Sequence, residues 1–207
     1  MRVQLENIHE HYGNIRANDG IGLTVEPGTI HGILGENGAG KSTLMKILSG
    51  FTPRTDGRIL LDGVPAEYRS PAEAAARGIG MLYQDPLDFP QLTVLDNFRL
   101  GGPTPKTRGA RRRLLTLNRD LDFALPPGAQ TGGLTVGERQ QLEILRLMDM
   151  GVGVLILDEP TTGISATQKA TLFAALRRMA DTGKSVILVS HKLEDVEALC
   201  DRVTVLR

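Results

Sequence analysis

The feature that most constrains this chain is a glycine-rich stretch, Gly35-Glu36-Asn37-Gly38-Ala39-Gly40-Lys41-Ser42-Thr43. It matches the pattern G-x-x-x-x-G-K-[ST] at every position. Residues 28–34 precede it and predict a short strand. Apolar residues recur with helical spacing over residues 44–48, and Gly50 stands where a helix end favours glycine. The stretch therefore predicts a strand, a glycine loop and a helix in succession.

This succession is the context in which such a loop binds nucleotide phosphates. Backbone N–H groups of the loop and the N-terminus of the following helix attract an anion. Lys41 is expected to reach the β- and γ-phosphates, and the Ser42 hydroxyl to ligate Mg²⁺. The residues expected to bind the nucleotide are Gly35, Asn37, Gly38, Gly40, Lys41, Ser42 and Thr43. A glycine turn before an ordinary helix does not explain the complete pattern.

Composition narrows the class of protein. The chain has 207 residues, enough for one large domain or a core with an inserted subdomain. Its 24 basic and 24 acidic residues balance, which argues against nucleic acid as the main partner. Cys200 is the only cysteine, so the chain has no internal disulfide and no cysteine metal cluster. Residues 1–10 contain no apolar run, so we expect no signal peptide, and no stretch of this sequence is apolar over a membrane-spanning length.

The N-terminal segment predicts an antiparallel β layer. Residues 3–8 and 21–25 alternate apolar and polar, as half-buried strands do, and residues 9–14 resemble a turn. Tyr12 in that turn has two open interpretations. Its ring either stacks on adenine or covers the edge of the sheet.

Further along, Ser70, Pro71 and Glu73 predict a helix start, since they fit the N-cap, first and third positions. Residues 79–83 predict a strand, and Gln84 follows it. Polar side chains at strand ends of an α/β sheet face the ligand crevice, although a solvated loop is the plainer interpretation of Gln84 alone.

From residue 85 to about residue 150 the sequence changes character. Prolines punctuate it and apolar residues take helical spacing, which predicts a helical subdomain inserted into the sheet domain. Its basic cluster, Arg108 and residues 111–113, is best explained as a solvated helix face. A loop over residues 132–138 leads into an amphipathic helix from Arg139 to about Met150, and it is a second potential anion site.

The last third of the chain alternates buried strands and helices. Residues 152–157 form an apolar run that ends in Asp158 and Glu159, as expected of a strand buried on both faces of a parallel sheet. Downstream of a phosphate loop, Asp158 suits Mg²⁺ and Glu159 suits a proton acceptor, although paired acids alone are more often helix caps. His191 follows the strand 185–190 and is well placed to touch a γ-phosphate.

Together these motifs identify a family. The chain resembles the nucleotide-binding domain of an ABC transporter along essentially its whole length. Residues 35–43 resemble the Walker A loop, residues 134–138 the ABC signature, and residues 154–159 Walker B. Gln84 resembles the Q-loop glutamine, and His191 resembles the switch histidine.

The resemblance implies an α/β fold: a P-loop NTPase (RecA-like) core with an N-terminal antiparallel β layer and an inserted helical subdomain. We expect the parts to span residues 1–84, 85–150 and 151–207. It implies that Glu159 is the general base, that Gln84 contacts Mg²⁺, and that Tyr12 stacks on adenine. Thr135 and Gly137 of the signature are then expected to contact the ATP of a second domain.

Departures from the family pattern lie in the signature and the D-loop. The signature has Thr135, Val136 and Glu138 where Ser, Gly and Gln are commonest, and Ser165 stands at the usual D-loop aspartate. Both departures are similar to the importers of simple sugars and nucleosides, whose ATPases often carry two such domains in one polypeptide. Family members usually continue beyond the position of Arg207, so we expect a first half of such a protein or a truncated one.

The implied cofactors are ATP and Mg²⁺, and the implied activity is ATP hydrolysis coupled to solute uptake. The implied partners are transmembrane permease subunits, a second ATP-binding domain (tandem or homodimeric) and, indirectly, a solute-binding protein, with no nucleic acid. The implied location is peripheral, on the cytoplasmic face of the cell (inner) membrane. A non-transport ABC ATPase acting on nucleic acid or the ribosome, and a regulatory ATP-binding domain with a degenerate site, remain alternatives.

Overall fold

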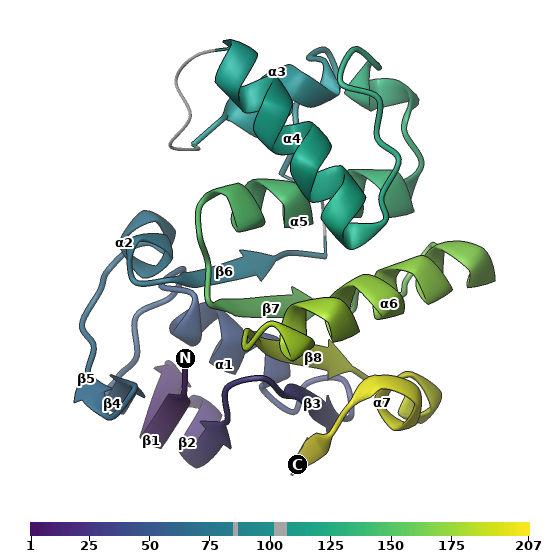
Figure 1. Ribbon diagram of the computed structural model, residues 1–207. Coiled ribbons are helices and arrows are strands. Elements are labelled where there is room, and N and C mark those ends of the chain that lie inside the picture. The colour runs from purple at the N-terminus through teal and green to yellow at the C-terminus, as the bar shows by residue number, and fades with distance from the viewer. Residues whose placement is uncertain (85–86, 102–106) are drawn as a thin grey trace.

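The computed structural model describes residues 1–84, 87–101 and 107–207 (Figure 1). They form a parallel sheet, an antiparallel sheet beside it and a group of helices above it, drawn at the top of the figure. In the described part of the chain, no helix is both long and apolar enough to cross a membrane.

The parallel sheet occupies the centre of the molecule. Its strand order is β6-β7-β8-β3-β9. The strands are β3 (Ile30–Gly35), β6 (Ile79–Leu82), β7 (Val154–Asp158), β8 (Ser185–Ser190) and β9 (Arg202–Leu206). All neighbours are parallel, so the carboxyl ends of the five strands meet at one edge of the sheet. Ligands of open α/β sheets bind outside that edge.

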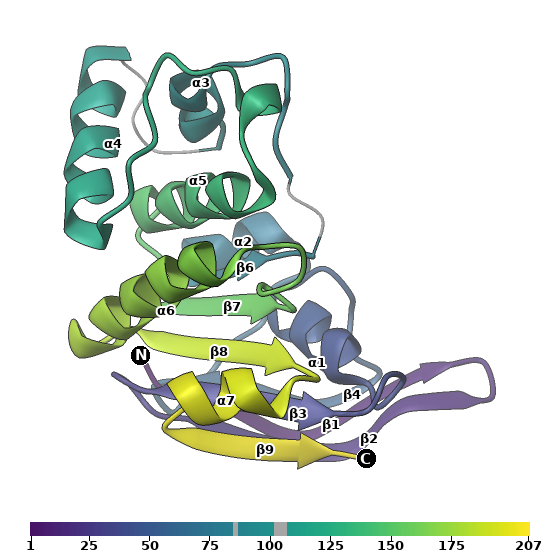
Figure 2. The same cartoon turned by 90° about the vertical axis from the view of Figure 1, so that its right-hand side faces the viewer.

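Both faces of this sheet are covered, as the continuous apolar run of β7 predicts. Leu155 and Leu157 pack in one core with the helices of the upper layer, whereas Val154 and Ile156 pack in a second core with the antiparallel sheet. Because successive side chains of a strand point to opposite faces, a strand between two cores must be apolar throughout. Figure 2 shows α6 (Ala166–Asp181) and α7 (Leu193–Leu199) over one face and α1 (Lys41–Leu48) on the opposite side.

The predicted N-terminal antiparallel layer is confirmed. Its strand order is β2-β1-β4-β5. The strands are β1 (Val3–Tyr12), β2 (Ile15–Val25), β4 (Asp56–Leu61) and β5 (Val64–Pro65).

The predicted turn over residues 9–14 is wrong, because β1 continues to Tyr12 and only Gly13 and Asn14 connect it to β2. Register shifts interrupt the pairing of β1 and β2 at three points, and Asn7 has a φ of 52°. These irregularities interrupt the alternation of apolar and polar residues from which a strand is predicted in a sequence.

The helix starts follow capping chemistry. Ser70 accepts a hydrogen bond from the Glu73 N–H and Pro71 begins α2 (Pro71–Ala76), as predicted. The predicted start of the next amphipathic helix at Arg139 is wrong, because α5 runs over Val136–Asp149. Thr135 and Glu138 form a capping box that starts α5 three residues earlier.

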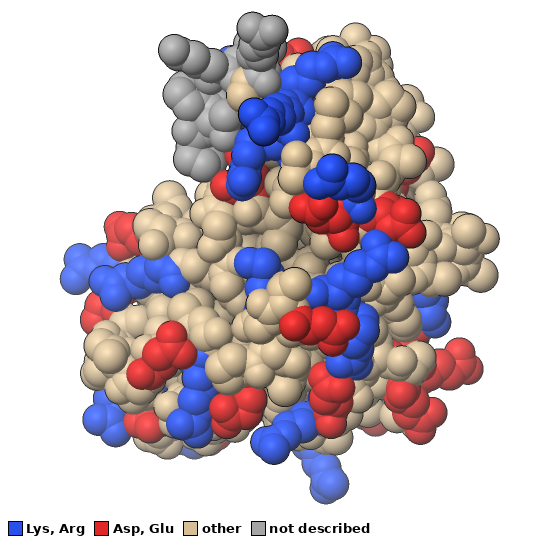
Figure 3. Space-filling model, viewed as in Figure 1, with Lys and Arg blue, Asp and Glu red and all other residues tan. Residues whose placement is uncertain are grey.

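The helices above the sheet include α3 (Val94–Arg99), α4 (Thr107–Leu121), the short 3-10 turn η1 (Thr131–Gly133) and α5. Lys and Arg side chains form a band over this region (Figure 3). Arg111 and Arg112 are exposed, and Arg113 forms an ion pair with the buried Asp149 of α5, with Nε 2.9 Å from Oδ1. The side chain of Arg108 lies outside the described part.

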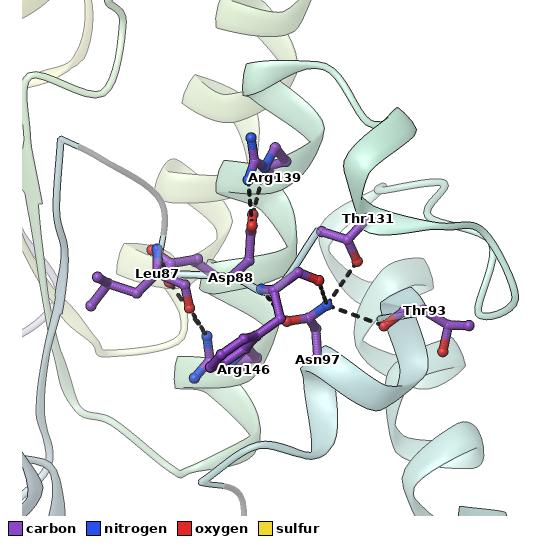
Figure 4. Close-up of polar contacts among 9 residues, drawn as sticks. Leu87, Asp88, Thr93, Asn97, Thr131, Arg139 and Arg146 are labelled. Atoms are coloured by element: carbon purple, nitrogen blue, oxygen red, sulfur yellow. Dashed lines mark hydrogen bonds and ion pairs between the residues drawn. The ribbon is translucent and has the colours of Figure 1, made fainter. Parts of the chain in front are cut away.

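A buried amide holds this helical layer together (Figure 4). Asn97 of α3 is fully buried. Its Nδ2 donates to the Phe89 carbonyl at 2.9 Å and to the Thr131 hydroxyl at 2.8 Å, while its Oδ1 accepts from the Phe89 N–H at 2.9 Å. One side chain thus joins α3 to the segment after β6 and to η1.

We predict that Asn97→Ala lowers the free energy of unfolding by about 2–4 kcal/mol, because it leaves several buried groups without partners. Urea unfolding measures this change. Asn14→Ala at the exposed hairpin turn is the control and is expected to change stability by less than about 0.5 kcal/mol. Equal stability of the two variants would contradict this role of Asn97.

Candidate functional site

The glycine loop lies where the sequence predicts it, between β3 and α1. Gly38 and Gly40 have φ values of 88° and 82°, in the region that glycine tolerates best. A Cβ at Gly40 would lie 2.2 Å from the Ala17 carbonyl oxygen, so only glycine fits there. The Nδ2 of Asn18 donates to the Gly40 carbonyl at 3.2 Å. Strand β2 therefore packs against the glycine loop and supports it at Gly40.

Lys41 begins α1 and is turned back over the loop. Its Nζ donates to the carbonyl oxygens of Gly35 at 2.7 Å and Glu36 at 3.0 Å, and the residue is buried. Glu36, Asn37 and Gly38 are exposed at the tip of the loop. The ammonium group is thus held in the concavity of the loop, where a phosphate oxygen would compete for it.

Ser42 and Asp158 bring oxygen atoms together beside the loop. Burial raises the pKa of the Asp158 carboxyl at the end of β7. The Ser42 side chain and the positive charges of Lys46 and Lys41 oppose that rise, so Ser42 lies close to this carboxyl. The Oδ1 of Asp158 is buried without a hydrogen-bond partner. A hydroxyl next to an unsatisfied buried carboxylate oxygen fits Mg²⁺, which prefers oxygen ligands. Thr43, the next residue of α1, is half-buried.

Glu159 and His191 meet at the carboxyl ends of β7 and β8. The His191 Nδ1 lies 2.8 Å from the Glu159 Oε2, as a close contact rather than an aligned hydrogen bond, since that oxygen has no hydrogen-bond donor. Glu159 has a φ of 51°, a conformation that costs a non-glycine residue about 1–2 kcal/mol. Its N–H donates to the Val189 carbonyl of β8 at 3.0 Å, which ties the strained residue to the sheet.

Gln84 and Tyr12 border this group. Leu82 of β6 pairs with Leu157 of β7, so Gln84, two residues after Leu82, lies at the same sheet edge as Asp158. Gln84 is exposed. Tyr12 is half-exposed and pairs with Ile15 near the tip of the hairpin whose second strand braces Gly40.

The fold therefore gathers the predicted phosphate loop, the acidic pair, His191 and Gln84 at one edge of the sheet (Figure 2). A cleft of about 910 Å³ adjoins the loop. It is lined by Gly35–Ala39, His191 and the end of β9.

The second glycine loop, residues 132–138, belongs to the helical layer and not to the group of residues at the edge of the sheet. Thr135 caps α5, and its hydroxyl accepts a hydrogen bond from the Gln168 Nε2 of α6 at 2.7 Å. A Cβ at Gly137 would lie 2.9 Å from the end of the Gln168 side chain, so a larger residue there would displace that side chain. Hydrogen bonds among the described residues join Thr135 to Glu138 and Gln168, and not to the phosphate loop.

Comparison with known proteins agrees with this geometry. The sequence model of the family described as ABC transporter matches residues 18–162, which include the phosphate loop, the second glycine loop and the acidic pair. The chain belongs to the ABC transporter family.

Relatives in this family are import proteins. A ribose import ATP-binding protein of Oceanobacillus iheyensis is 35% identical over 213 residues, which cover 100% of this chain and 43% of the relative. A glucose import ATP-binding protein of Haloferax volcanii is 41% identical over 238 residues, which cover 99% of this chain and 43% of the relative. The chain thus spans less than half the length of these curated relatives.

A solved structure of the family shows the fold. The crystal structure of a nucleotide-free ATP-binding cassette from an ABC transporter is 24% identical and superposes with a TM-score of 0.88. The match covers 100% of this chain and 88% of the other. The predicted P-loop NTPase core with its antiparallel layer and helical insertion is confirmed.

Sequence reasoning missed two residues that support the candidate site. Gln168 holds the signature loop, and the pattern Ser165-x-x-Gln168 is a readable capping box, which the structure forms at the start of α6. Asn18 braces the Walker A loop, but no local pattern marks it, because its partner is 22 residues away in the sequence.

We predict that Gly40→Ala destabilises the fold by at least about 1 kcal/mol more than Gly38→Ala. Both positions have positive φ, but only a Cβ at Gly40 meets backbone. Urea unfolding of the two variants measures the difference, and the Gly38→Ala protein serves as the matched control. Equal losses would mean that the close approach to Ala17 does not constrain the loop.

Proposed function

We propose that this chain is the ATP-binding and ATP-hydrolysing domain of an ABC importer for a simple sugar or nucleoside. The observation that carries the proposal is the contact of Glu159 with His191 at the sheet edge that also holds the phosphate loop and Asp158. A domain that only bound ATP would not need a carboxylate and an imidazole paired at that place.

Each side chain has a role that follows from its position. Lys41 exchanges the loop carbonyls of Gly35 and Glu36 for phosphate oxygens, so the loop offers a cation when nucleotide arrives. Ser42, Asp158 and Gln84 would hold Mg²⁺, whose chemistry is to neutralise charge on the phosphates. The remaining loop residues bind by backbone N–H groups, and Tyr12 stacks on adenine from the hairpin.

Hydrolysis needs a base for the attacking water. The Glu159 Oε2 has no hydrogen-bond donor and is therefore free to accept the proton. The His191 imidazole, whose Nδ1 lies 2.8 Å away, helps to position this carboxylate. Glu159 is accordingly the catalytic base, and His191 is its partner near the γ-phosphate.

A second ATP-binding domain completes the site. The signature loop with Thr135 and Gly137 ends at a helix N-terminus, a place suited to an anion, and it lies on the helical layer rather than at its own phosphate loop. We propose that it faces the ATP of a partner domain, in tandem or as a homodimer. Hydrolysis then removes the phosphate that joins the two domains. Ser165, at the usual D-loop aspartate, caps α6 through the Gln168 N–H at 3.2 Å.

The proposed partners are transmembrane permease subunits that dock near the Gln84 region and the helical layer. In this proposal, the domain boundaries at residues 84 and 150 separate the α/β core from the inserted helices. The solute-binding protein would act through those subunits, and the protein would lie on the cytoplasmic face of the cell membrane. The zero net charge supports a partner other than nucleic acid.

We predict that Lys41→Ala weakens ATP binding by about 10- to 100-fold, because it removes a charged donor worth about 1.5–3 kcal/mol. Isothermal calorimetry measures the affinity. Lys184→Ala is the control, since its Nζ donates to the Val152 carbonyl at 2.8 Å, at the opposite end of the strands. Unchanged affinity in the Lys41 variant would remove the loop from the proposed nucleotide site.

We predict that Glu159→Gln keeps ATP binding but lowers the turnover number by about 10²- to 10⁴-fold, the usual contribution of a general base. Phosphate release measures turnover. The exposed Glu194 of α7 provides the control, and Glu194→Gln is expected to turn over normally. Light scattering of the Glu159 variant should show an ATP-dependent dimer. A monomer that still binds ATP would contradict the composite site.

A further inference from the structure

The hairpin formed by β1 and β2 carries a cluster of side chains that the nucleotide site does not use. The hairpin extends away from the body of the molecule (Figure 2). Its residues His9, His11 and Asp19 each offer one ligand atom, a ring nitrogen or a carboxylate oxygen, and these atoms all lie within 4.8 Å of one another. Zinc proteins bind their metal through imidazoles and carboxylates of this kind. We call these three residues the hairpin cluster.

A bulge brings the side chains of the two strands together. Between two consecutive pairs of the ladder, β1 contributes one residue, His9, whereas β2 contributes two, Asp19 and Gly20. Gly20 has a φ of 68°, in the region that favours glycine. His9 and His11 are two residues apart in one strand and so lie on the same face of the sheet. A bulge changes the direction of the side chains beside it, and here it sets the Asp19 carboxylate next to these imidazoles.

His9 and Asp19 meet through atoms that both carry lone pairs. The Gly20 N–H donates to the His9 Nδ1 at 3.2 Å, so in this arrangement that nitrogen has no hydrogen of its own. The Asp19 Oδ1 lies 3.0 Å from the same nitrogen. Two ligands of a tetrahedral Zn²⁺ ion, each about 2.0–2.1 Å from it, lie roughly 3.3 Å apart, which is close to this separation. A cation shared by the two atoms removes their repulsion.

A proton is the competing explanation for this contact. On the His9 Nδ1 it would join the imidazole to Asp19 as an ion pair, but His11 would then have no part in the cluster. The two imidazole rings are nearly perpendicular, at 81°, with centroids 6.2 Å apart, so they are not stacked on each other. A metal ion, which takes several ligands, accounts for both rings and the carboxylate together.

The surroundings of the cluster keep Asp19 ionised and open to solvent. The side chain of His9 is 24% exposed and that of Asp19 is 50% exposed, so an ion can reach both. Arg16 donates to the Asp19 Oδ2 at 3.0 Å, which leaves Oδ1 for the ion, and this hydrogen bond lowers the pKa of Asp19. The charge of Arg16 opposes a cation, whereas Asp56 of β4, which pairs with His9 in the ladder on its other side, offsets that charge.

The types of ligand select the ion. Imidazole nitrogen suits Zn²⁺ and its first-row neighbours, whereas Mg²⁺ prefers oxygen ligands. The hairpin cluster is therefore chemically distinct from the proposed Mg²⁺ site at Ser42 and Asp158, which offers oxygen atoms. Three protein ligands leave one position of a zinc tetrahedron to water.

We propose that His9, His11 and Asp19 bind one Zn²⁺ ion, which ties β1 to β2 at the bulge. Asp19 is exposed, whereas its neighbour Asn18 is buried and donates to the Gly40 carbonyl at 3.2 Å. The ion therefore holds the strand that supports the glycine loop, from the side that the loop does not contact.

Binding is measured by isothermal titration of ZnCl₂ into the nucleotide-free protein after treatment with a chelator and dialysis. One ion per chain is expected. His11→Gln and Asp19→Asn are expected to weaken binding at least about tenfold, since loss of a supporting partner alone costs a metal site about 10- to 100-fold. Both residues are exposed, so both variants are expected to fold. Glu6→Gln removes another acid of β1, one paired with Arg58, and is the control that is expected to bind Zn²⁺ normally.

A second experiment assigns the ligands. The chain has four histidines, and in protein with ¹³C-labelled histidine, Zn²⁺ is expected to shift the ring signals of His9 and His11 and leave those of His31 and His191 in place. His191 with Glu159 is the rival imidazole and carboxylate pair, with 2.8 Å between them. His191→Gln is therefore expected to keep the full affinity for Zn²⁺, and an excess of MgCl₂ is not expected to displace the ion.

Three outcomes would overturn the proposal. They are full binding of Zn²⁺ by both His11→Gln and Asp19→Asn, loss of binding in His191→Gln, and an unaltered protein that binds no Zn²⁺. In the last case a proton, and not a metal, joins His9 to Asp19. Neither experiment uses ATP, so failure of the proposed ATPase function would leave these results unaffected.

Discussion

The parallel hydrogen bonding of the central sheet is the constraint on which the rest of the structure depends. β3 pairs with β8, and β8 with β7, so the phosphate loop, His191 and Asp158 leave the sheet at the same edge. No local interaction between these segments would bring them together, because more than a hundred residues separate the loop from Asp158. The ladder does so since parallel strands end side by side, and their apolar side chains fill a core on each face of the sheet.

The helical layer is organised by a different kind of interaction. The apolar core that it shares with the central sheet is supplemented by buried polar groups. Asn97 joins α3 to η1, and Glu143 and Arg139 join residues 87–88 to α5. Hydrogen bonds of this kind are directional, so they fix the position of a segment more strictly than apolar contact does. Residues 87–92 belong to no helix or strand, and their backbone groups need such partners wherever they are buried. The polar contacts therefore determine how residues 87–88 lie against α5.

The sequence predicted the regular elements where local chemistry and burial agree. The strand before Asp158 follows from its continuous apolar run, and the start of α2 from its capping residues. The prediction failed where the strand pairing is irregular. Residues 9–14 were predicted as a turn, but β1 continues through register shifts to Tyr12. It also placed the start of α5 late, although the capping box of Thr135 and Glu138 is present in the sequence. The division at residues 84 and 150 stays a prediction.

The sequence by itself predicted the chemical parts of the candidate site. The glycine loop with Lys41 and Ser42, the acidic pair and the family resemblance are all local patterns, because each needs a fixed spacing along the chain. The tertiary structure alone decided that the Glu159 carboxylate lies 2.8 Å from His191, that Asn18 supports Gly40, and that Glu143 receives the Leu87 N–H. Their partners lie on other elements, so their positions depend on how strands and helices pack and not on neighbouring residues.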